Sequence, residues 1–291
     1  MNRKSFTLIE LMVVVIVVGI VSAIIYGSAT SINDRAVFTR AQLFSQKINN
    51  SLADSIAGEW TLYEGAGSSA SDSSGNGNTG TITGATWETT KTNCVSDNCL
   101  NFSGSNQYVS KASPVNLPSG QSARTISVWV YPNNVNPGGS IVSLSNTAAT
   151  SQSFILMINY IDPNTYLFTD AINGNNNITI SGEEIPSAGK WSNMVFSFDG
   201  GSSWKYYLNG ELKKQGTFGT QINTVENDIS IGRRADGSSY SYWPGRIDEV
   251  VIFSSVLSAF QVEERYYSEL NKFFIEGCLD GKEYQEILGR K

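Results

Sequence analysis

A long apolar run near the start of the chain constrains everything that follows it. The run extends from Phe6 to Tyr26 and holds a single charged side chain, Glu10. A helix needs about 20 apolar residues to cross a bilayer, so this run is predicted to span a membrane. Arg3 and Lys4 precede it, and positive charge stays on the cytoplasmic side. The rest of the chain is therefore expected outside the cytoplasm.

The charge within the run indicates a function beyond anchoring. An ionised carboxylate in hydrocarbon costs about 3 kcal/mol unless it is paired or lies near the interface. Two simpler alternatives are a plain signal anchor, in which Glu10 reaches the headgroups, and a cleaved secretory signal. The second needs a small-residue cleavage site, of which Ser22 and Ala23 are a poor version.

The residues S-F-T-L-I-E-L-M-V-V-V-I-V-V-G-I, from Ser5 onward, resemble the N-terminus of a type IV prepilin or pseudopilin. The resemblance implies that a prepilin peptidase cuts between Ser5 and Phe6 and that the new Phe6 amine is methylated. It also implies that Glu10 neutralises the Phe6 ammonium group of a neighbouring subunit during filament assembly. Ser5 stands where Gly is usual, and Gly27 stands where a helix-kinking Pro is frequent.

The same resemblance implies a localisation and a set of partners. Residues 1–5 form a leader, and residues 6–26 hold the subunit in the inner membrane by a single pass before it joins an extracellular filament. The partners are the prepilin peptidase and other pilin subunits. Apolar residues continue at three- and four-residue steps as far as Leu52, which predicts one amphipathic helix over 6–57 that stops at Gly58.

Composition excludes several classes of function. The chain has 291 residues, a formal net charge of −6 and no histidine. An acidic chain without a basic stripe is a poor nucleic-acid binder, so no nucleic-acid partner is expected. Without histidine, the commonest general base and the commonest zinc ligand are missing. Carboxylate chemistry and oxygen-ligand metals remain.

Three cysteines lie in the part expected outside, where disulfides persist. Cys94 and Cys99 flank the short segment V-S-D-N, and we favour a bridge between them. Cys278 is then free or paired with a partner chain.

From Gly58 onward the chain consists of short alternating runs separated by Gly, Ser, Thr and Asn. This pattern is typical of an all-β sandwich or barrel. Asn209-Gly210 predicts a tight hairpin. The predicted strands are 125–131, 140–145, 153–159, 191–198, 204–208, 228–232 and 245–253.

Successive blocks of this region resemble a laminin G-like, concanavalin A-like jelly roll, among them G-E-W-T-L-Y-E-G-A-G, C-L-N-F-S-G-S-N-Q-Y-V, K-W-S-N-M-V-F-S-F-D-G and P-G-R-I-D-E-V-V-I-F. The resemblance implies a two-sheet antiparallel jelly roll over 58–270, carried by the long N-terminal helix. Ser258 and Gln261 predict a capped helix over 257–270. Residues 271–291 are expected to form a helical tail.

Laminin G-like domains often hold a structural calcium ion, and the resemblance places its ligands in the loop D-S-S-G-N-G-N and on the last strand. The ligands implied are Asp72, Asn76, Asn78 and Asp248. Oxygen ligands and glycines suit a hard cation. The alternative is a hydrogen-bonded turn that holds no metal.

The segment R-R-A-D-G-S-S-Y-S-Y-W-P-G is a second candidate, because aromatic faces and hydrogen-bonding groups suit a sugar or a peptide. Alternatively, its tryptophan and one tyrosine close the end of the sandwich. Trp129, Trp191 and Phe196 are expected in the core. The candidate ligand-binding residues are Arg233, Arg234, Asp236, Tyr240, Tyr242 and Trp243.

No enzyme is expected. Retaining glycosidases need two carboxyl groups about 5 Å apart. Glu183 and Glu184 precede a proline, and the adjacent Asp248 and Glu249 should point to opposite faces of a strand. The two resemblances together imply a filament subunit whose head binds a glycan or surface ligand. The alternatives are a mainly structural pilin without a ligand and a pseudopilin of a secretion system.

Overall fold

The computed structural model describes residues 50–134, 138–145, 151–161, 164–169, 176–225, 228–236 and 242–275. The predicted leader, the cleavage and assembly residues Ser5, Phe6 and Glu10, and the predicted membrane span 6–26 lie outside the described residues. So does Cys278. Among the helices of the described part, none combines the length and apolar character that a membrane crossing needs.

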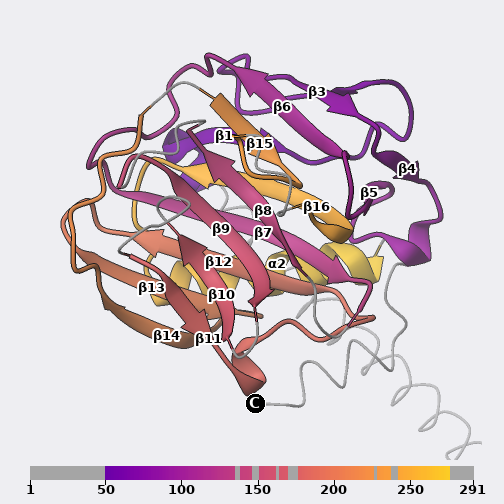
Figure 1. The fold of residues 1–291 in the computed structure, drawn as a ribbon. Helices are drawn as coiled ribbons and strands as arrows, with labels where there is room; N and C mark the ends of the chain where they lie inside the picture. Colours follow the sequence, from indigo (N-terminus) through magenta and orange to yellow (C-terminus); the bar gives the residue numbers. More distant parts are fainter. Residues whose placement is uncertain are drawn as a thin grey trace, which may run out of the picture. The chain divides into compact units, whose positions relative to one another are not determined.

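Two antiparallel sheets stack as a jelly-roll-like β-sandwich (Figure 1). The strands of the first sheet are β1 (Ile56–Trp60), β4 (Thr86–Glu88), β5 (Cys99–Ser103), β7 (Arg124–Pro132), β12 (Ser192–Phe198), β13 (Ser203–Leu208), β14 (Glu211–Thr217) and β16 (Pro244–Phe253). They lie in the order β14-β13-β12-β7-β16-β5-β4, and β1 also pairs with β16.

The second sheet covers one face of the first. Its strands are β2 (Ser69–Ala70), β3 (Gly80–Thr83), β6 (Tyr108–Ala112), β8 (Gly138–Leu144), β9 (Phe154–Ile161), β10 (Asn164–Thr169), β11 (Ile178–Ile180) and β15 (Asp228–Ile231). They lie in the order β11-β10-β9-β8-β15-β6-β3-β2. The described residues also form three short 3-10 helices: η1 (Ala53–Ser55) precedes β1, η2 (Lys91–Asn93) lies between β4 and β5, and η3 (Gly182–Glu184) lies between β11 and β12.

The predicted strands are all present, as β7, β8, β9, β12, β13, β15 and β16. The hairpin predicted at Asn209-Gly210 joins β13 to β14. Both turn residues have positive φ angles, 52° and 80°, as a two-residue type I′ turn requires. Asparagine and glycine tolerate this conformation better than other residues, which explains the strength of the sequence signal.

Aromatic rings join the two sheets at the centre of the sandwich. Phe196 of β12 stacks on Phe168 of β10 with ring centroids 5.1 Å apart. Phe154 of β9 meets the Phe168 ring edge-on at 4.8 Å. Phe196 therefore lies in the core, as predicted. Trp129 is also buried, but in a second hydrophobic cluster on the outer face of the first sheet, and Trp191 is only partly buried against that cluster.

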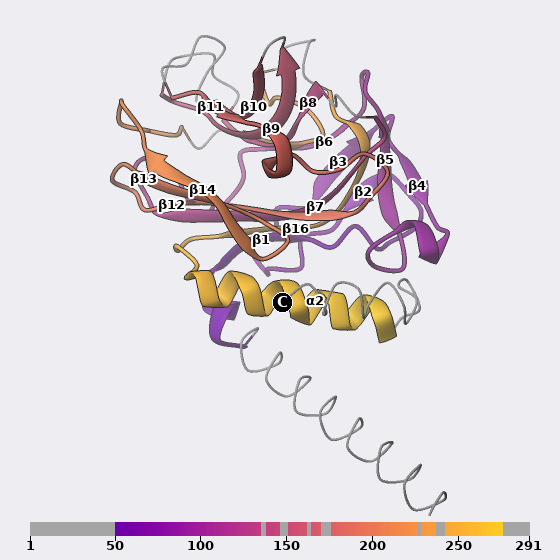
Figure 2. The same ribbon diagram turned by 90° about the horizontal axis from the view of Figure 1, so that it is seen from below.

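One helix, α2 (Ala259–Ile275), covers that outer face (Figure 2). The predicted capping box is confirmed: the backbone N–H of Ser258 donates to the Gln261 side chain, and that of Gln261 donates to the Ser258 hydroxyl. The helix continues past residue 270, so residues 271–275 belong to it and not to a separate tail. The remainder of the predicted tail, 276–291, lies outside the described residues.

The predicted N-terminal helix ends earlier than residue 57. Residues 53–55 form η1, and β1 begins at Ile56. Pairing of β1 with β16 overrides the helical pattern, because it adds sheet hydrogen bonds and buries Trp60 in the core. Gly58 has a role besides ending the helix: a Cβ there would lie 2.6 Å from the Trp60 ring.

Candidate functional site

The loop after β2 is closed by the carboxylate of Asp72. Its Oδ1 accepts hydrogen bonds from the backbone N–H groups of Glu59 and Ser74, both at 3.0 Å, and its Oδ2 accepts one from Asn78 at 2.8 Å. Burial alone would raise the pKa of Asp72, but the hydrogen bonds, from Ser74 first, lower it on balance. The carboxylate thus stabilises a tight turn in its charged form.

The two asparagines expected as calcium ligands are also hydrogen-bonded. The amide of Asn78 accepts from the Val115 backbone N–H at 2.7 Å and donates to the Val115 carbonyl at 2.9 Å. Asn76 donates to the carbonyl of Ala57 and accepts from the side chain of Asn116. These contacts match the metal-free turn that the sequence left as an alternative.

Asp248, the fourth expected ligand, lies elsewhere. It is fully buried on β16, and its Oδ2 accepts from the backbone N–H groups of Val95 at 3.1 Å and Ser96 at 2.9 Å. Asp72 instead accepts from the backbone N–H of Glu59 on β1, and Glu59 pairs with Val251, which lies three residues after Asp248 on β16. Three residues along a strand span about 10 Å. The structure therefore does not bring Asp248 together with the loop.

The structure groups Asp72, Asn76 and Asn78 in one loop and holds Asp248 through the backbone of Val95 and Ser96. In the ranges that the structure describes, no three acidic or cysteine side chains gather so that they could hold a metal ion.

Asp248 holds the loop between the paired cysteines. Cys94 and Cys99, the pair that the sequence favours, form a disulfide with Cα atoms 5.5 Å apart. The backbone of Val95 and Ser96 bonds to Asp248 from inside this loop, and Val95 packs against Trp129 and the end of α2. The disulfide loop and the helix are therefore docked on the same patch of the first sheet.

Asp248 and Glu249 do not point to opposite faces, so that prediction is wrong. The pairing of β16 with β7 is irregular between Asp248 and Val251, and Glu249 has a φ of 47°. A bulge of this kind adds a residue to one strand and re-aims its side chains. Glu249 consequently reaches α2, where Lys272 Nζ lies 3.0 Å from its Oε1.

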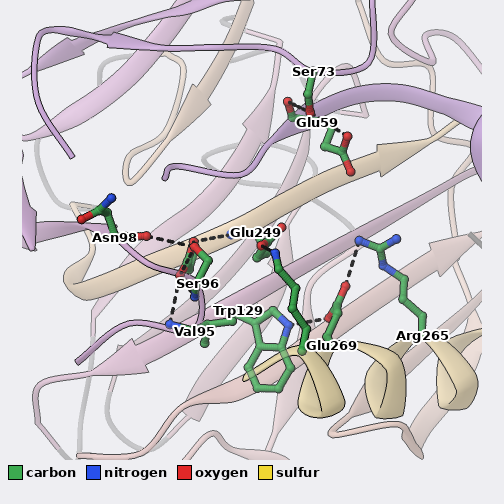
Figure 3. A network of polar contacts seen from close by, with 11 residues as sticks. Glu59, Ser73, Val95, Ser96, Asn98, Trp129, Glu249, Arg265 and Glu269 are labelled. Atoms are coloured by element: carbon green, nitrogen blue, oxygen red, sulfur yellow. Dashed lines mark hydrogen bonds and ion pairs between the residues drawn. The ribbon is translucent and has the colours of Figure 1, made fainter. Parts of the chain in front are cut away.

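Glu269 of α2 lies in the same contact between the helix and the first sheet as Glu249 of β16 (Figure 3). We call the charged side chains of this contact the helix seal. Its Oε2 accepts from the indole N–H of Trp129 at 2.5 Å, and its Oε1 lies 2.8 Å from Arg265 Nη2. The described charged groups of the helix seal are Asp248, Glu249, Arg265, Glu269 and Lys272.

Burial governs the titration of the helix seal. It raises the pKa of Asp248 well above its ordinary value, and the charge of Glu249 raises it further. Burial also raises the pKa of Glu269, although Arg265 opposes the change. Asp248 and Glu249 on β16 and Glu269 on α2 are all buried, so these carboxyl groups lie in the contact between the helix and the first sheet.

The segment around Trp243 is used mainly for packing. Trp243 is fully buried in the core, and its indole N–H donates to the carbonyl of Arg246 at 3.3 Å. Arg234 and Asp236 form an ion pair of 2.8 Å with side chains only 7% and 5% exposed. These contacts match the alternative in which the tryptophan closes the sandwich.

The other members of that segment do not add a described binding surface. The guanidinium of Arg233 lies 3.4 Å from the ring centroid of Tyr108. Tyr242 is half-buried, and its backbone forms an isolated parallel β-bridge with Ser140. Tyr240 lies outside the described residues.

A cleft that the sequence did not indicate opens between the edge strand β11 of the second sheet and the edge strand β14 of the first; Figure 2 shows these strands one above the other. Its volume is about 260 Å³. We call it the β11–β14 cleft. It is lined by Asn176, Asn177, Ile178, Thr179, Trp204, Lys214, Thr217, Phe218 and Gly219.

Comparison with known families matches two parts of the chain. Residues 103–263, more than half of the chain, match the family described as the concanavalin A-like lectin/glucanases superfamily. Residues 1–26 match the prokaryotic N-terminal methylation motif. No curated protein matches the chain.

Several solved structures share the fold. Domain 4 of AbnA, a GH43 extracellular arabinanase from Geobacillus stearothermophilus, in complex with arabinotriose, is 20% identical with a TM-score of 0.56; the match covers 73% of this chain and 98% of that domain. The binding domain of Paraclostridial Mosquitocidal Protein 1 is 15% identical with a TM-score of 0.58, covering 76% of this chain and 53% of that one.

The ligand binding domain of botulinum neurotoxin serotype D, in complex with N-acetylneuraminic acid, is 16% identical with a TM-score of 0.52. Here the match covers 77% of this chain and 53% of that chain, so this chain spans about half the length of both toxin domains. Identities this low show a shared fold and nothing further.

Removal of divalent cations tests whether the loop at Asp72 is stable without a bound metal ion. We expect a calcium chelator to leave the melting temperature of the full-length chain in detergent unchanged, because backbone N–H groups already satisfy the carboxylate. The matched variant Asp72→Ala should lower the melting temperature equally with and without calcium. A fall on chelation that added calcium reverses would contradict this reading.

The helix seal predicts a dependence of stability on pH. A carboxyl group whose pKa is higher in the folded than in the unfolded state stabilises the fold at low pH and loses this effect as pH rises through the folded pKa. The free energy of unfolding should therefore fall as pH rises above about 4, the ordinary pKa of a carboxyl group, and the chain has no histidine to contribute to this fall.

Glu269→Gln should make that fall shallower, because it removes one of the two titrating groups. The control is Glu211→Gln, which replaces the exposed carboxylate of the ion pair with Lys213 and should keep the wild-type slope. Denaturant unfolding of the full-length chain at several pH values measures both slopes. Equal slopes for wild type and Glu269→Gln would contradict the account.

Proposed function

Since the chain belongs to the concanavalin A-like lectin/glucanases superfamily, we propose that it is a subunit of a type IV pilus or related filament whose head binds a glycan. The observation that carries the proposal is the combination of two parts in one chain. The methylation motif occupies residues 1–26, and the lectin-like head follows it.

The motif supports the filament half of the proposal. It implies processing by a prepilin peptidase and assembly with other pilins. In this account Glu10 pairs with the Phe6 amine of a neighbouring subunit, and residues 6–26 anchor the chain in the inner membrane before assembly. The head is then displayed outside the cell.

The fold supports the binding half. Two of the similar solved structures were obtained with a saccharide, arabinotriose in one and N-acetylneuraminic acid in the other. The head also has an open cleft with aromatic and polar lining. The acidic residues of the helix seal are buried between α2 and the first sheet, so binding is better supported than catalysis.

Processing at the N-terminus tests the filament half. Mass spectrometry of the chain from sheared surface filaments should find N-methylated Phe6 as the first residue. Glu10→Leu should be cut normally but fall to background in the filament fraction, because the Phe6 amine loses its counter-charge. Glu211→Gln in the head is the control and should assemble like wild type. A chain that begins at Met1 and is missing from filaments would overturn this half.

Glycan binding by the full-length chain in detergent tests the other half. On an array of bacterial, plant and animal glycans, we expect binding above the signal of the heat-denatured chain. Binding to no glycan at any concentration that remains soluble would overturn this half and leave the filament half standing.

A further inference from the structure

We propose that the β11–β14 cleft binds one neutral sugar ring of the glycan and that it does so through Trp204. This inference rests on the proposed glycan-binding function. It assigns the site to the open edge of the sandwich and not to the segment 233–245, which held the candidate ligand-binding residues of the sequence.

The first observation is an unused hydrogen-bond donor. Trp204 is 7% exposed, and among the described residues no protein oxygen accepts from its indole N–H, which is not one of the buried side-chain atoms left without a partner. This N–H is therefore open to solvent, and a ligand oxygen can take the place of its water. The other five tryptophans all donate to a protein oxygen: Trp60, Trp87, Trp129, Trp191 and Trp243.

The second observation is the aromatic floor of the cleft. The rings of Trp204 and Phe218 lie 6.3 Å apart, and Phe218 is 8% exposed. Trp204 is directly opposite Gly216 in the β13–β14 pair, where a Cβ would lie 2.7 Å from the indole ring. Glycine at this position therefore makes room for the indole at the edge of the sheet.

The third observation concerns the rim of the cleft, which is polar and whose one positive charge is balanced by a nearby carboxylate. The side chains of Asn177, Thr179 and Thr217 are exposed at the cleft. Lys214 donates to the carbonyl of Thr179 at 2.7 Å and lies 3.3 Å from a carboxylate oxygen of Glu184. Since Glu184 already balances the charge of Lys214, the rim suits an uncharged ligand.

One wall of the cleft is held in place before any ligand binds. The side chain of Asn176 donates to the carbonyl and the hydroxyl of Thr220, at 2.9 Å and 2.7 Å, and accepts from the Thr220 backbone N–H at 3.1 Å. A preformed wall lowers the ordering cost of binding.

These features match a sugar ring in chemistry and in size. A pyranose has an apolar face of C–H groups, which suits Trp204 and Phe218, and a rim of hydroxyl groups, which suits amides, hydroxyls and the free indole N–H. The volume of about 260 Å³ is below the range of about 300–1,000 Å³ typical of drug-sized ligands. The cleft therefore takes one ring of a longer glycan.

The indole N–H groups provide a direct test. In nitrogen-15 NMR spectra of the full-length chain in detergent, each tryptophan gives one indole signal, and Trp204→Phe identifies the signal of Trp204. The probes are methyl glycosides of glucose, galactose, mannose, arabinose and N-acetylglucosamine, with a methyl glycoside of N-acetylneuraminic acid as the charged comparison. We expect at least one neutral probe to shift the Trp204 signal while the other indole signals stay in place.

Variants separate this site from other sites on the head. Trp204→Phe and the rim variant Asn177→Ala should each weaken binding of that probe about tenfold or more, which corresponds to about 1.4 kcal/mol. Trp87→Phe, which removes an indole elsewhere on the head, is the matched control and should bind like wild type. Dispersed spectra and unchanged melting temperatures confirm that Asn177→Ala is folded even if Trp204→Phe is not.

The outcomes distinguish this inference from the function on which it rests. If the array finds a glycan but the Trp204 signal stays fixed and Asn177→Ala binds normally, the cleft is not the site and glycan binding stands. If only the charged probe binds at Trp204, the neutral assignment is wrong. If no array glycan and no probe binds, both the inference and the glycan-binding half of the proposed function fail.

Discussion

Strand β16 is hydrogen-bonded along both of its edges, and the other features of the head depend on that pairing. One edge pairs with β7, and the other pairs first with β5 and then with β1. The irregularity between Asp248 and Val251 lies where the second partner changes. It turns two acidic side chains toward the same outer face, which lets one strand hold both the disulfide loop and α2.

The contact between α2 and the first sheet combines apolar packing with paired charges. Trp129 stacks on Tyr266 with ring centroids 5.7 Å apart and meets Phe273 edge-on at 5.0 Å. Burying Glu269 and Arg265 costs desolvation energy, and their ion pair mainly offsets that cost. Apolar burial therefore stabilises the docked helix, while the hydrogen bonds fix where it docks.

The sequence predicted the features that depend on local patterns. Alternating strands, the Asn209-Gly210 turn and the cap at Ser258 each follow from a few neighbouring residues, and the structure has them. The early end of the N-terminal helix and the bulge at Glu249 arise from pairing with distant strands. The β11–β14 cleft could not be predicted, because Trp204 meets residues near 177 only once the two sheet edges are placed.

In the proposed function one chain carries both an assembling N-terminus and a head that binds at its open edge, so one measurement tests both parts together. Filaments sheared from cells that express wild type or Trp204→Phe, adjusted to equal amounts, are passed over a surface coated with the glycan that the array identifies. We predict that wild-type filaments are retained and Trp204→Phe filaments pass through. Equal retention of both, or filaments that lack the chain, would contradict the account.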